Sequence, residues 1–337
     1  QSTAKQGFGA GQVLILDGGN GHALRRNGVL IKGVIGTMER FLNVALANRD
    51  QPQIVIKTHL QYLRAGANVI TTNNYSCVPA AIELSPDNSP ELVIDLIERA
   101  GRLAQQACDT FLAESPAGTA RPLVAGGLPP LHESYRADRV EQIHQKFQSS
   151  LLNPIFGPWK FDFEFWKQVS DNDRELIEGY AMIAKHITPF CDVLLCETMS
   201  SVREGKFAAE AANCMGKPVW IAWTLADETH GTLRSGETVE EAVAAVAHCK
   251  NIEAMLFNCC SHEAILAALP RLRAAAPPGM ALGAYANGFA KTMRPLVYLQ
   301  TVVRKQSVEY EDITGHQYAT QAREWMDAAG VTIIGGG

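Results

Sequence analysis

Short apolar segments alternate with longer segments of helical periodicity along the chain. The apolar segments are nearly continuous aliphatic and β-branched runs, which is typical of parallel strands buried on both faces. Between them, apolar residues such as Leu176, Tyr180 and Ile183 recur along one helical face. The pattern predicts eight strands, over residues 13–17, 68–73, 122–126, 192–197, 219–224, 254–258, 281–285 and 331–334.

Eight such units favour a single (β/α)₈ TIM barrel of the α/β class, occupying residues 1–337. Ser201 with Glu204, and Thr238 with Glu241, predict capping boxes that begin helices directly after two of the strands. The alternative fold is a doubly wound parallel sheet, which would call for a G-x-G-x-x-G loop after its first strand. The first loop here, residues 17–21, reads Asp-Gly-Gly-Asn-Gly and lacks that spacing.

Two segments depart from the repeating pattern. Residues 147–173 are rich in Phe and Trp and contain Pro154 and Pro158, so we predict an insertion between the third and fourth βα units. This insertion could serve as a lid over the barrel, as a subunit contact or as a surface excursion without a direct role. The second segment is the end, Gly335-Gly336-Gly337, which follows the eighth strand directly. We therefore expect an eighth helix and a tail beyond Gly337.

Composition narrows the possible partners and compartment. The net charge is −5 and the pI is about 6.0, and no run of Lys and Arg forms a basic stripe, so we expect no nucleic-acid partner. No apolar stretch reaches the roughly 18 residues of a membrane helix, and no signal peptide precedes the first strand. These features predict a cytoplasmic protein that acts on small molecules, and they predict no particular oligomeric state. Its eight cysteines are then expected to be free thiols.

Polar residues stand at the ends of the predicted strands, where barrel enzymes place their chemistry. Asp17 adjoins the backbone amides of Gly18 and Gly19, so this loop could bind the ammonium and the carboxylate of an amino acid. A helix-capping aspartate in a tight turn is the alternative interpretation. Glu197 closes an apolar strand, and charged groups are rarely buried unless paired. A salt bridge with a neighbouring arginine is the alternative for Glu197.

Asn258, Cys259 and Cys260 follow another apolar strand. A thiolate at this position could bind a metal ion at the barrel mouth. Two adjacent cysteines cannot complete a tetrahedral site by themselves, however. Buried, unreactive cysteines are the alternative interpretation.

Taken together, these motifs resemble the homocysteine S-methyltransferase family, which includes betaine- and S-methylmethionine-dependent enzymes. The resemblance implies a zinc-dependent barrel that transfers a methyl group to homocysteine. The matching motifs occur in family order over almost the whole chain, as LDGGNG (16–21), ITTNNY (70–75), AGGLPP (125–130), CET (196–198), FNC (257–259) and YANG (285–288).

The resemblance also implies roles for individual residues. Cys259 would be a zinc ligand and the central catalytic residue, and the other cysteine ligands would follow Gly337. Cys260 is a second candidate for one of these ligands. The residues that would bind homocysteine are Asp17, Gly18, Gly19 and Glu197. Further residues would line the substrate pocket, namely Thr72, Asn73 and Asn258.

The implied reaction is an in-line methyl transfer from a sulfonium or quaternary ammonium donor to a zinc-bound thiolate, giving methionine. An aromatic ring could hold the cationic donor, with Trp159, Trp166 and Tyr285 as candidates. The sequence does not choose among S-methylmethionine, S-adenosylmethionine, betaine and dimethylsulfoniopropionate. Three other functions stay open. They are transfer to another thiol or selenol, a catalytically inactive barrel with a binding role, and a corrinoid-linked methyltransferase, for whose partner domain the chain leaves little room.

Overall fold

The strands form a parallel sheet that curls into a barrel. The computed structural model describes residues 13–33, 37–132, 134–135, 171–227, 231–288 and 313–337. Its eight-stranded sheet has the order β1-β8-β7-β6-β5-β4-β3-β2. A parallel bridge between Leu16 and Val69 joins β1 to β2, so the two ends of the sheet meet. The predicted (β/α)₈ barrel is thus confirmed, with strands β1 (Leu14–Ile15), β2 (Val69–Thr71), β3 (Leu123–Leu128), β4 (Val193–Met199), β5 (Val219–Trp223), β6 (Ile252–Asn258), β7 (Ala281–Tyr285) and β8 (Ile333–Ile334).

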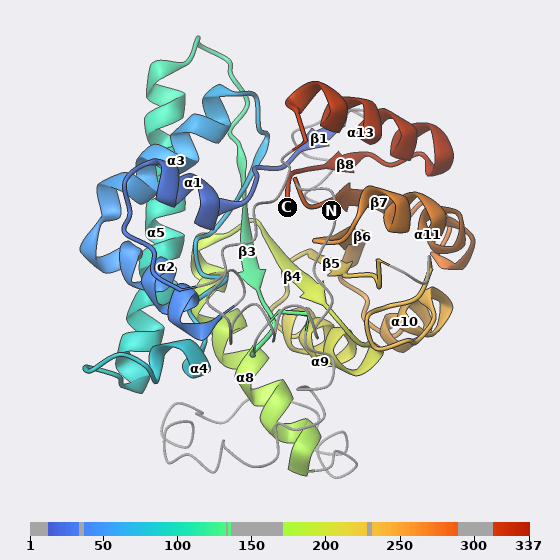
Figure 1. Cartoon of the computed structure of the whole chain (residues 1–337), viewed down its shortest axis with the longest axis horizontal. Coiled ribbons are helices and arrows are strands. Elements are labelled where there is room, and N and C mark those ends of the chain that lie inside the picture. Colours follow the sequence, from blue (N-terminus) through green and yellow to red (C-terminus); the bar gives the residue numbers. More distant parts are fainter. Residues whose placement is uncertain (1–12, 34–36, 133, 136–170, 228–230, 289–312) are drawn as a thin grey trace.

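Helices surround this sheet on its outer side (Figure 1). The largest helix–helix contacts join neighbours around the ring, such as α8 with α9, α3 with α5, and α11 with α13. The helices are α1 (Asn20–Arg26), α2 (Met38–Asp50), α3 (Pro52–Arg64), α4 (Pro79–Ile82), α5 (Pro90–Glu114), α8 (Asp171–Ile187), α9 (Val202–Asn213), α10 (Val239–Val246), α11 (His262–Ala275) and α13 (Gly315–Ala329), with the 3₁₀ turn η3 (Thr188–Phe190).

Two apolar clusters hold the barrel together. The smaller one fills the barrel interior and includes Trp220 and Leu256, which are 1% and 0% exposed. The larger one lies between the strands and the helices, and it contains the α8 residues Tyr180 and Ile183. Burial on both faces explains why the strands read as continuous apolar runs in the sequence.

Gly283 on β7 leaves room for Leu256 inside the barrel. A Cβ atom at position 283 would overlap with Leu256 Cδ2. We expect Gly283→Ala to lower the free energy of unfolding by about 1–3 kcal/mol, because overpacking forces neighbouring side chains out of their rotamers. Urea unfolding would measure this, with Gly315→Ala as the control because no heavy atom of the described residues lies within 4 Å of a Cβ there. Equal stabilities of the two variants would contradict the packing argument.

One of the two predicted capping boxes is complete in the structure and the other is partial. The Thr238–Glu241 capping box is complete, with both reciprocal hydrogen bonds present. Ser201 caps α9 through the amide of Glu204, but the Glu204 carboxylate accepts from the Ser200 amide and hydroxyl instead. The aromatic insertion predicted over residues 147–173 lies almost wholly outside the described residues, which resume at 171.

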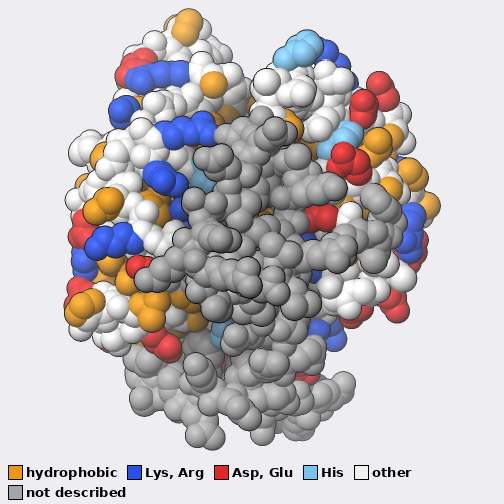
Figure 2. All heavy atoms as spheres, viewed as in Figure 1, with side chains coloured by type: hydrophobic (Ala, Val, Ile, Leu, Met, Phe, Trp, Pro, Cys, Tyr) orange, Lys and Arg blue, Asp and Glu red, His pale blue; other side chains and the backbone are white. Residues whose placement is uncertain are grey.

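The outer surface carries charges of both signs. Figure 2 shows Lys and Arg side chains interspersed with Asp and Glu around the helices at the rim of this face. Within the described ranges, no helix combines the length and the apolar character that crossing a membrane requires.

Candidate active site

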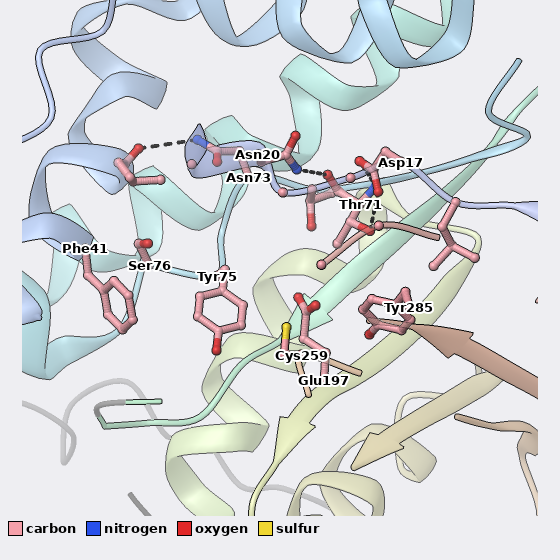
Figure 3. Close-up of a pocket in the computed structure, with 18 of the residues that line it drawn as sticks. Asp17, Asn20, Phe41, Thr71, Asn73, Tyr75, Ser76, Glu197, Cys259 and Tyr285 are labelled. Atoms are coloured by element: carbon pink, nitrogen blue, oxygen red, sulfur yellow. Dashed lines mark hydrogen bonds between the residues drawn. The ribbon is translucent and has the colours of Figure 1, made fainter. Parts of the chain in front are cut away.

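A pocket opens at the carboxyl ends of the strands, where the sequence predicted the chemistry. Its walls come from the loop after β1, from α2, from the segment after β2, and from the ends of β4, β6 and β7 (Figure 3). Parallel strands all end on the same side of a barrel, and this brings together residues that are far apart in the sequence. Of the predicted site residues, seven line the pocket: Asp17, Gly18, Gly19, Thr72, Asn73, Glu197 and Cys259.

Asp17 is buried at the end of β1 and is held by the neighbouring strand. Its carboxylate oxygens accept hydrogen bonds from the Thr71 amide at 2.8 Å and from the Thr71 hydroxyl at 3.0 Å. Burial nevertheless raises the pKa of Asp17 to about 7, against the opposing effect of these two bonds. No cation pairs with Asp17 within the described residues. Asp17 is not the capping residue of α1, because the N-cap there is Gly19 with no side-chain cap, and the hydrogen bonds of Asp17 to Thr71 on β2 outweigh its interaction with Asn20.

Glu197 lies across the pocket from Asp17, near the end of β4. It is 8% exposed, and burial raises its pKa to about 8, with the negative charge of Asp17 as the second cause. The nearby Tyr285 hydroxyl opposes this rise, although it makes no hydrogen bond to any described residue. No arginine of the described chain pairs with Glu197, so the salt-bridge alternative is not what the structure has. Two buried carboxylates that lack a cation make this end of the pocket suited to an ammonium group.

Donors for an anion lie beside the two carboxylates. The amides of Gly18 and Gly19 donate to no group in the described part of the chain. A Cβ at Gly18 would stand 3.1 Å from the Tyr62 ring, and one at Gly19 would stand 3.1 Å from the Gly337 carbonyl oxygen. The loop is therefore packed closely while its amides stay available, which suits the carboxylate of an amino acid.

Cys259 and Thr198 both have left-handed backbones, with φ of 53° and 63°. Such angles are rare outside glycine, and for a β-branched residue such as Thr198 they are strained. The Asn258 side chain supports both: its Oδ1 accepts from the Thr198 amide at 2.9 Å, while its Nδ2 donates to Thr198 Oγ1 at 2.8 Å and to Cys259 Sγ at 3.3 Å. Asn258 is 0% exposed and lies behind the pocket, where it positions the residues that line it.

The predicted lining residues Thr72 and Asn73 reach the pocket with their polar groups already engaged. The Thr72 hydroxyl donates to Asn74 Oδ1 at 2.6 Å and accepts from the Gly127 amide at 3.1 Å. The Asn73 amide donates to Asn48 Oδ1 at 3.0 Å, toward α2. These bonds fix the segment after β2 against the neighbouring elements.

Sequence reasoning did not identify four further residues that line the pocket, Arg40, Phe41, Tyr75 and Ser76. Arg40 and Phe41 belong to α2, whose polar and apolar residues look like those of any outer helix. Tyr75 is part of the ITTNNY motif, and that motif was the only available signal. Figure 3 shows Phe41 and Ser76 at one end of the pocket, Asp17 and Tyr285 toward the other, and Glu197 and Cys259 between them.

The described residues do not complete a metal site. They contain no group of three or more His, Cys, Asp or Glu side chains that could hold a metal ion. Cys259 lines the pocket, whereas Cys260 is 0% exposed and belongs to the apolar cluster outside the barrel. Burial, followed by the charge of Glu197, raises the pKa of Cys259 to about 11. Gly336 and Gly337 line the same pocket as this thiol.

These features define a barrel enzyme whose pocket suits a small amino acid close to a cysteine thiol. Comparison with known proteins agrees, because the family model described as "Homocysteine S-methyltransferase" matches residues 14–337. The chain belongs to the homocysteine S-methyltransferase family and is a methyltransferase. The family resemblance drawn from the sequence motifs is thereby confirmed.

Individual relatives are distant but match over nearly the full chain. Homocysteine S-methyltransferase from Escherichia coli is 26% identical, over 96% of this chain and 90% of the relative. Homocysteine S-methyltransferase 4 from Zea mays is 23% identical, over 96% of this chain and 79% of the relative. A solved structure of the E. coli homocysteine methyltransferase MmuM in its metallated form has a TM-score of 0.65 at 23% identity, covering 96% of this chain and 91% of that one. At this identity the structural likeness supports the fold.

Proposed function

We propose that this protein transfers a methyl group from a sulfonium or quaternary ammonium donor to the thiol of homocysteine, giving methionine. The observation that carries the proposal is the pairing of two buried carboxylates, Asp17 and Glu197, with the unengaged amides of Gly18 and Gly19. An ammonium bound between the carboxylates would supply the missing cation, and the α-carboxylate would take the two amides. The side chain of the amino acid would then extend toward Cys259, which lines the same pocket.

The chemistry requires little from the protein beyond positioning. A homocysteine thiolate attacks the methyl carbon, the new S–C bond forms, and the electron pair of the broken bond returns to the sulfur or nitrogen of the donor. The sulfur or nitrogen atom of the donor is left uncharged, so its departure needs no general acid. Holding both substrates in line removes much of the entropic barrier.

We propose zinc as the cofactor and Cys259 as the ligand that the described residues contribute. When bound, zinc would keep the sulfur of homocysteine in its nucleophilic thiolate form. The proposal rests on family membership and on the placement of Cys259. Gly336 and Gly337 line the same pocket as Cys259.

Incubating the zinc-loaded, full-length protein with homocysteine and each candidate donor tests the function. We expect methionine, detected by mass spectrometry, from at least one donor, and its loss in Cys259→Ser. A wild-type protein that binds zinc but forms no methionine from any donor would direct attention to another thiol or selenol acceptor. A protein that neither binds zinc nor forms methionine would be the inactive barrel, and the proposal would be wrong.

A further inference from the structure

Arg234 lies in the segment after β5, and its guanidinium joins three separate parts of the chain. Its side chain is 10% exposed and forms an ion pair with Asp227 at 3.3 Å. Its Nε donates to Thr224 Oγ1 at 3.0 Å, and its Nη2 donates to the carbonyl oxygen of Cys259 at 3.3 Å. The guanidinium also lies over the Tyr135 ring, with Cζ 4.5 Å from the ring centroid. Because a buried charge is costly unless it is paired and hydrogen-bonded, this set of contacts holds Arg234 in one position.

Both peptide groups that flank the Cα atom of Cys259 are held by hydrogen bonds. On one side, the Cys259 amide donates to the Tyr285 carbonyl at 3.0 Å. On the other side, the Cys259 carbonyl accepts from Thr224 Oγ1 at 3.2 Å and from Arg234 Nη2 at 3.3 Å. Two fixed peptide groups fix φ and ψ, and these angles set the direction of the Cα–Cβ bond. The hydrogen bonds to the backbone of Cys259 therefore determine where its thiol lies.

The backbone of Cys259 needs this support because its conformation is strained. Its φ angle of 53° lies in the left-handed region, which residues other than glycine seldom occupy. Strained angles of this kind persist only when the surrounding structure holds them. Figure 3 shows the Cys259 sulfur next to Glu197 in the pocket. If the backbone relaxed toward the right-handed or extended region, the thiol would turn away from this position.

Asp227 connects Arg234 to the residues that follow Cys259. Its Oδ2 pairs with Arg234, while its Oδ1 accepts from the Ser261 amide at 2.6 Å. Ser261 is the N-cap of α11, and its side chain accepts from the Ala264 amide. The ion pair between Arg234 and Asp227 therefore links the segment after β5 both to Cys259 and to the start of α11.

We propose that Arg234 is a positioning residue that directs the Cys259 thiol into the pocket by holding the Cys259 carbonyl, with Asp227 and Thr224 as its supports. Arg234 is not among the described residues that line the pocket, so it acts through Cys259 and not on a substrate. The inference rests on the proposed function only in taking Cys259 as the functional thiol. It adds a residue 25 positions away in the sequence on which the placement of that thiol depends.

Zinc affinity tests the inference, because residues that orient a metal ligand affect how tightly the metal is held. In the full-length protein, we expect Arg234→Met to raise the Kd for zinc by about 10- to 100-fold, measured by competition with a chromophoric chelator. Arg234→Lys should recover part of the loss, since it keeps the charge but not the planar fork of donors. Thr224→Val removes the other donor to the same carbonyl and should raise the Kd by about 2- to 10-fold. If Arg234→Met does not fold, an unchanged Kd in these two other variants would overturn the inference.

Arg273→Met is the matched control. The Arg273 guanidinium also donates to backbone carbonyls, those of Met280, Ala329 and Gly330 at 3.0, 3.1 and 3.4 Å, and these precede β7 and β8 in the chain. Its replacement should lower the thermal stability, as Arg234→Met does, but leave the Kd for zinc unchanged. Equal increases of the Kd in the two variants would mean that lost stability accounts for the effect. An unchanged Kd in a folded Arg234→Met protein would likewise overturn the inference.

Crystal structures of the metal-free, full-length wild type and Arg234→Met separate this inference from the proposed function. In the variant we expect φ of Cys259 to leave the left-handed region and Sγ to move by about 1 Å or more, a displacement that is large for a catalytic group. If the wild type binds no zinc and forms no methionine while Sγ is displaced in the variant, the methyl transfer is wrong and the role of Arg234 stands. If the wild type forms methionine while Sγ keeps its place in the variant, the function stands and the role of Arg234 is wrong.

Discussion

Replacing Glu197 by glutamine is expected to lower kcat/KM for homocysteine about 100-fold, because one of two carboxylates that bind the ammonium loses its charge. The same change should make the unliganded protein more stable at alkaline pH. Burial and Asp17 raise the pKa of Glu197 to about 8, from 4.5. The folded state thus holds this proton more tightly than the unfolded state does.

The sign of the stability effect follows from that difference. A carboxyl whose pKa is raised by folding stabilises the fold at low pH, and this contribution is lost as the pH rises toward 8. Glu197→Gln cannot ionise and so does not lose this stability. Its free energy of unfolding should exceed that of the wild type by roughly 2–4 kcal/mol at pH 8.5 and by less than about 1 kcal/mol at pH 5. Urea unfolding at the two pH values measures it.

Glu204→Gln is a control outside the pocket. Glu204 is also a buried carboxylate whose pKa is raised by burial, but it accepts hydrogen bonds from the Ser200 amide at 2.7 Å and hydroxyl at 2.8 Å, and it does not line the pocket. Its replacement should leave the KM for homocysteine unchanged. If Glu197→Gln is destabilising at pH 8.5 and leaves that KM unchanged, Glu197 is a structural group and the acceptor site is misassigned.

Asn258→Ala is expected to reduce both activity and stability. The substitution leaves the Thr198 amide and hydroxyl, which face Asn258 at 2.9 and 2.8 Å, without their partner in a buried strand. Losing these bonds should lower the free energy of unfolding by about 2–4 kcal/mol. The strained backbones of Thr198 and Cys259 should then relax and displace Glu197 and the thiol, lowering kcat about 100-fold for a shift near 1 Å.

The opposite end of β6 supplies a matched control. Asn251 also makes two hydrogen bonds across to one residue: its amide donates to Asn213 Oδ1 at 3.0 Å and its Nδ2 donates to Asn213 O at 2.9 Å. Asn251→Ala should destabilise the protein without changing kcat. Equal losses of kcat in the two variants would mean that stability alone accounts for the effect, and that Asn258 does not position the site.

The fold was predictable because burial on both faces of the barrel makes the strands continuous in apolar character. All eight predicted strands are present, and the prediction for β7, residues 281–285, matches it residue for residue. The boundaries of β1 and β8 were less accurate, because each keeps only two residues of its apolar run in the ladder. Strand pairing depends on neighbours that are distant in the sequence, so local composition cannot fix where the ladder ends.

The site was predictable where polar residues interrupt apolar runs, as Asp17, Glu197 and Cys259 do. It was not predictable where a functional residue lies in an ordinary amphipathic helix. Arg40 occupies such a helix, and only the fold reveals that it lines the pocket. The function of Asn258 was also hidden, since its contact with Thr198 spans 60 residues of sequence.

The shortness of β1 and β8 affects how the protein unfolds locally. The two strands pair through only Leu14 with Ile333 and Ile15 with Ile334, whereas β5 and β6 pair over five positions. Local opening should therefore begin at this seam, where few backbone bonds protect the amides from hydrogen exchange. Gly18 and Gly19 follow β1, whereas Gly336 and Gly337 follow β8, and all four line the pocket. Opening between β1 and β8 would therefore separate two parts of the pocket wall while most of the barrel stays intact. A bound ligand that contacts both parts should slow hydrogen exchange in β1 and β8.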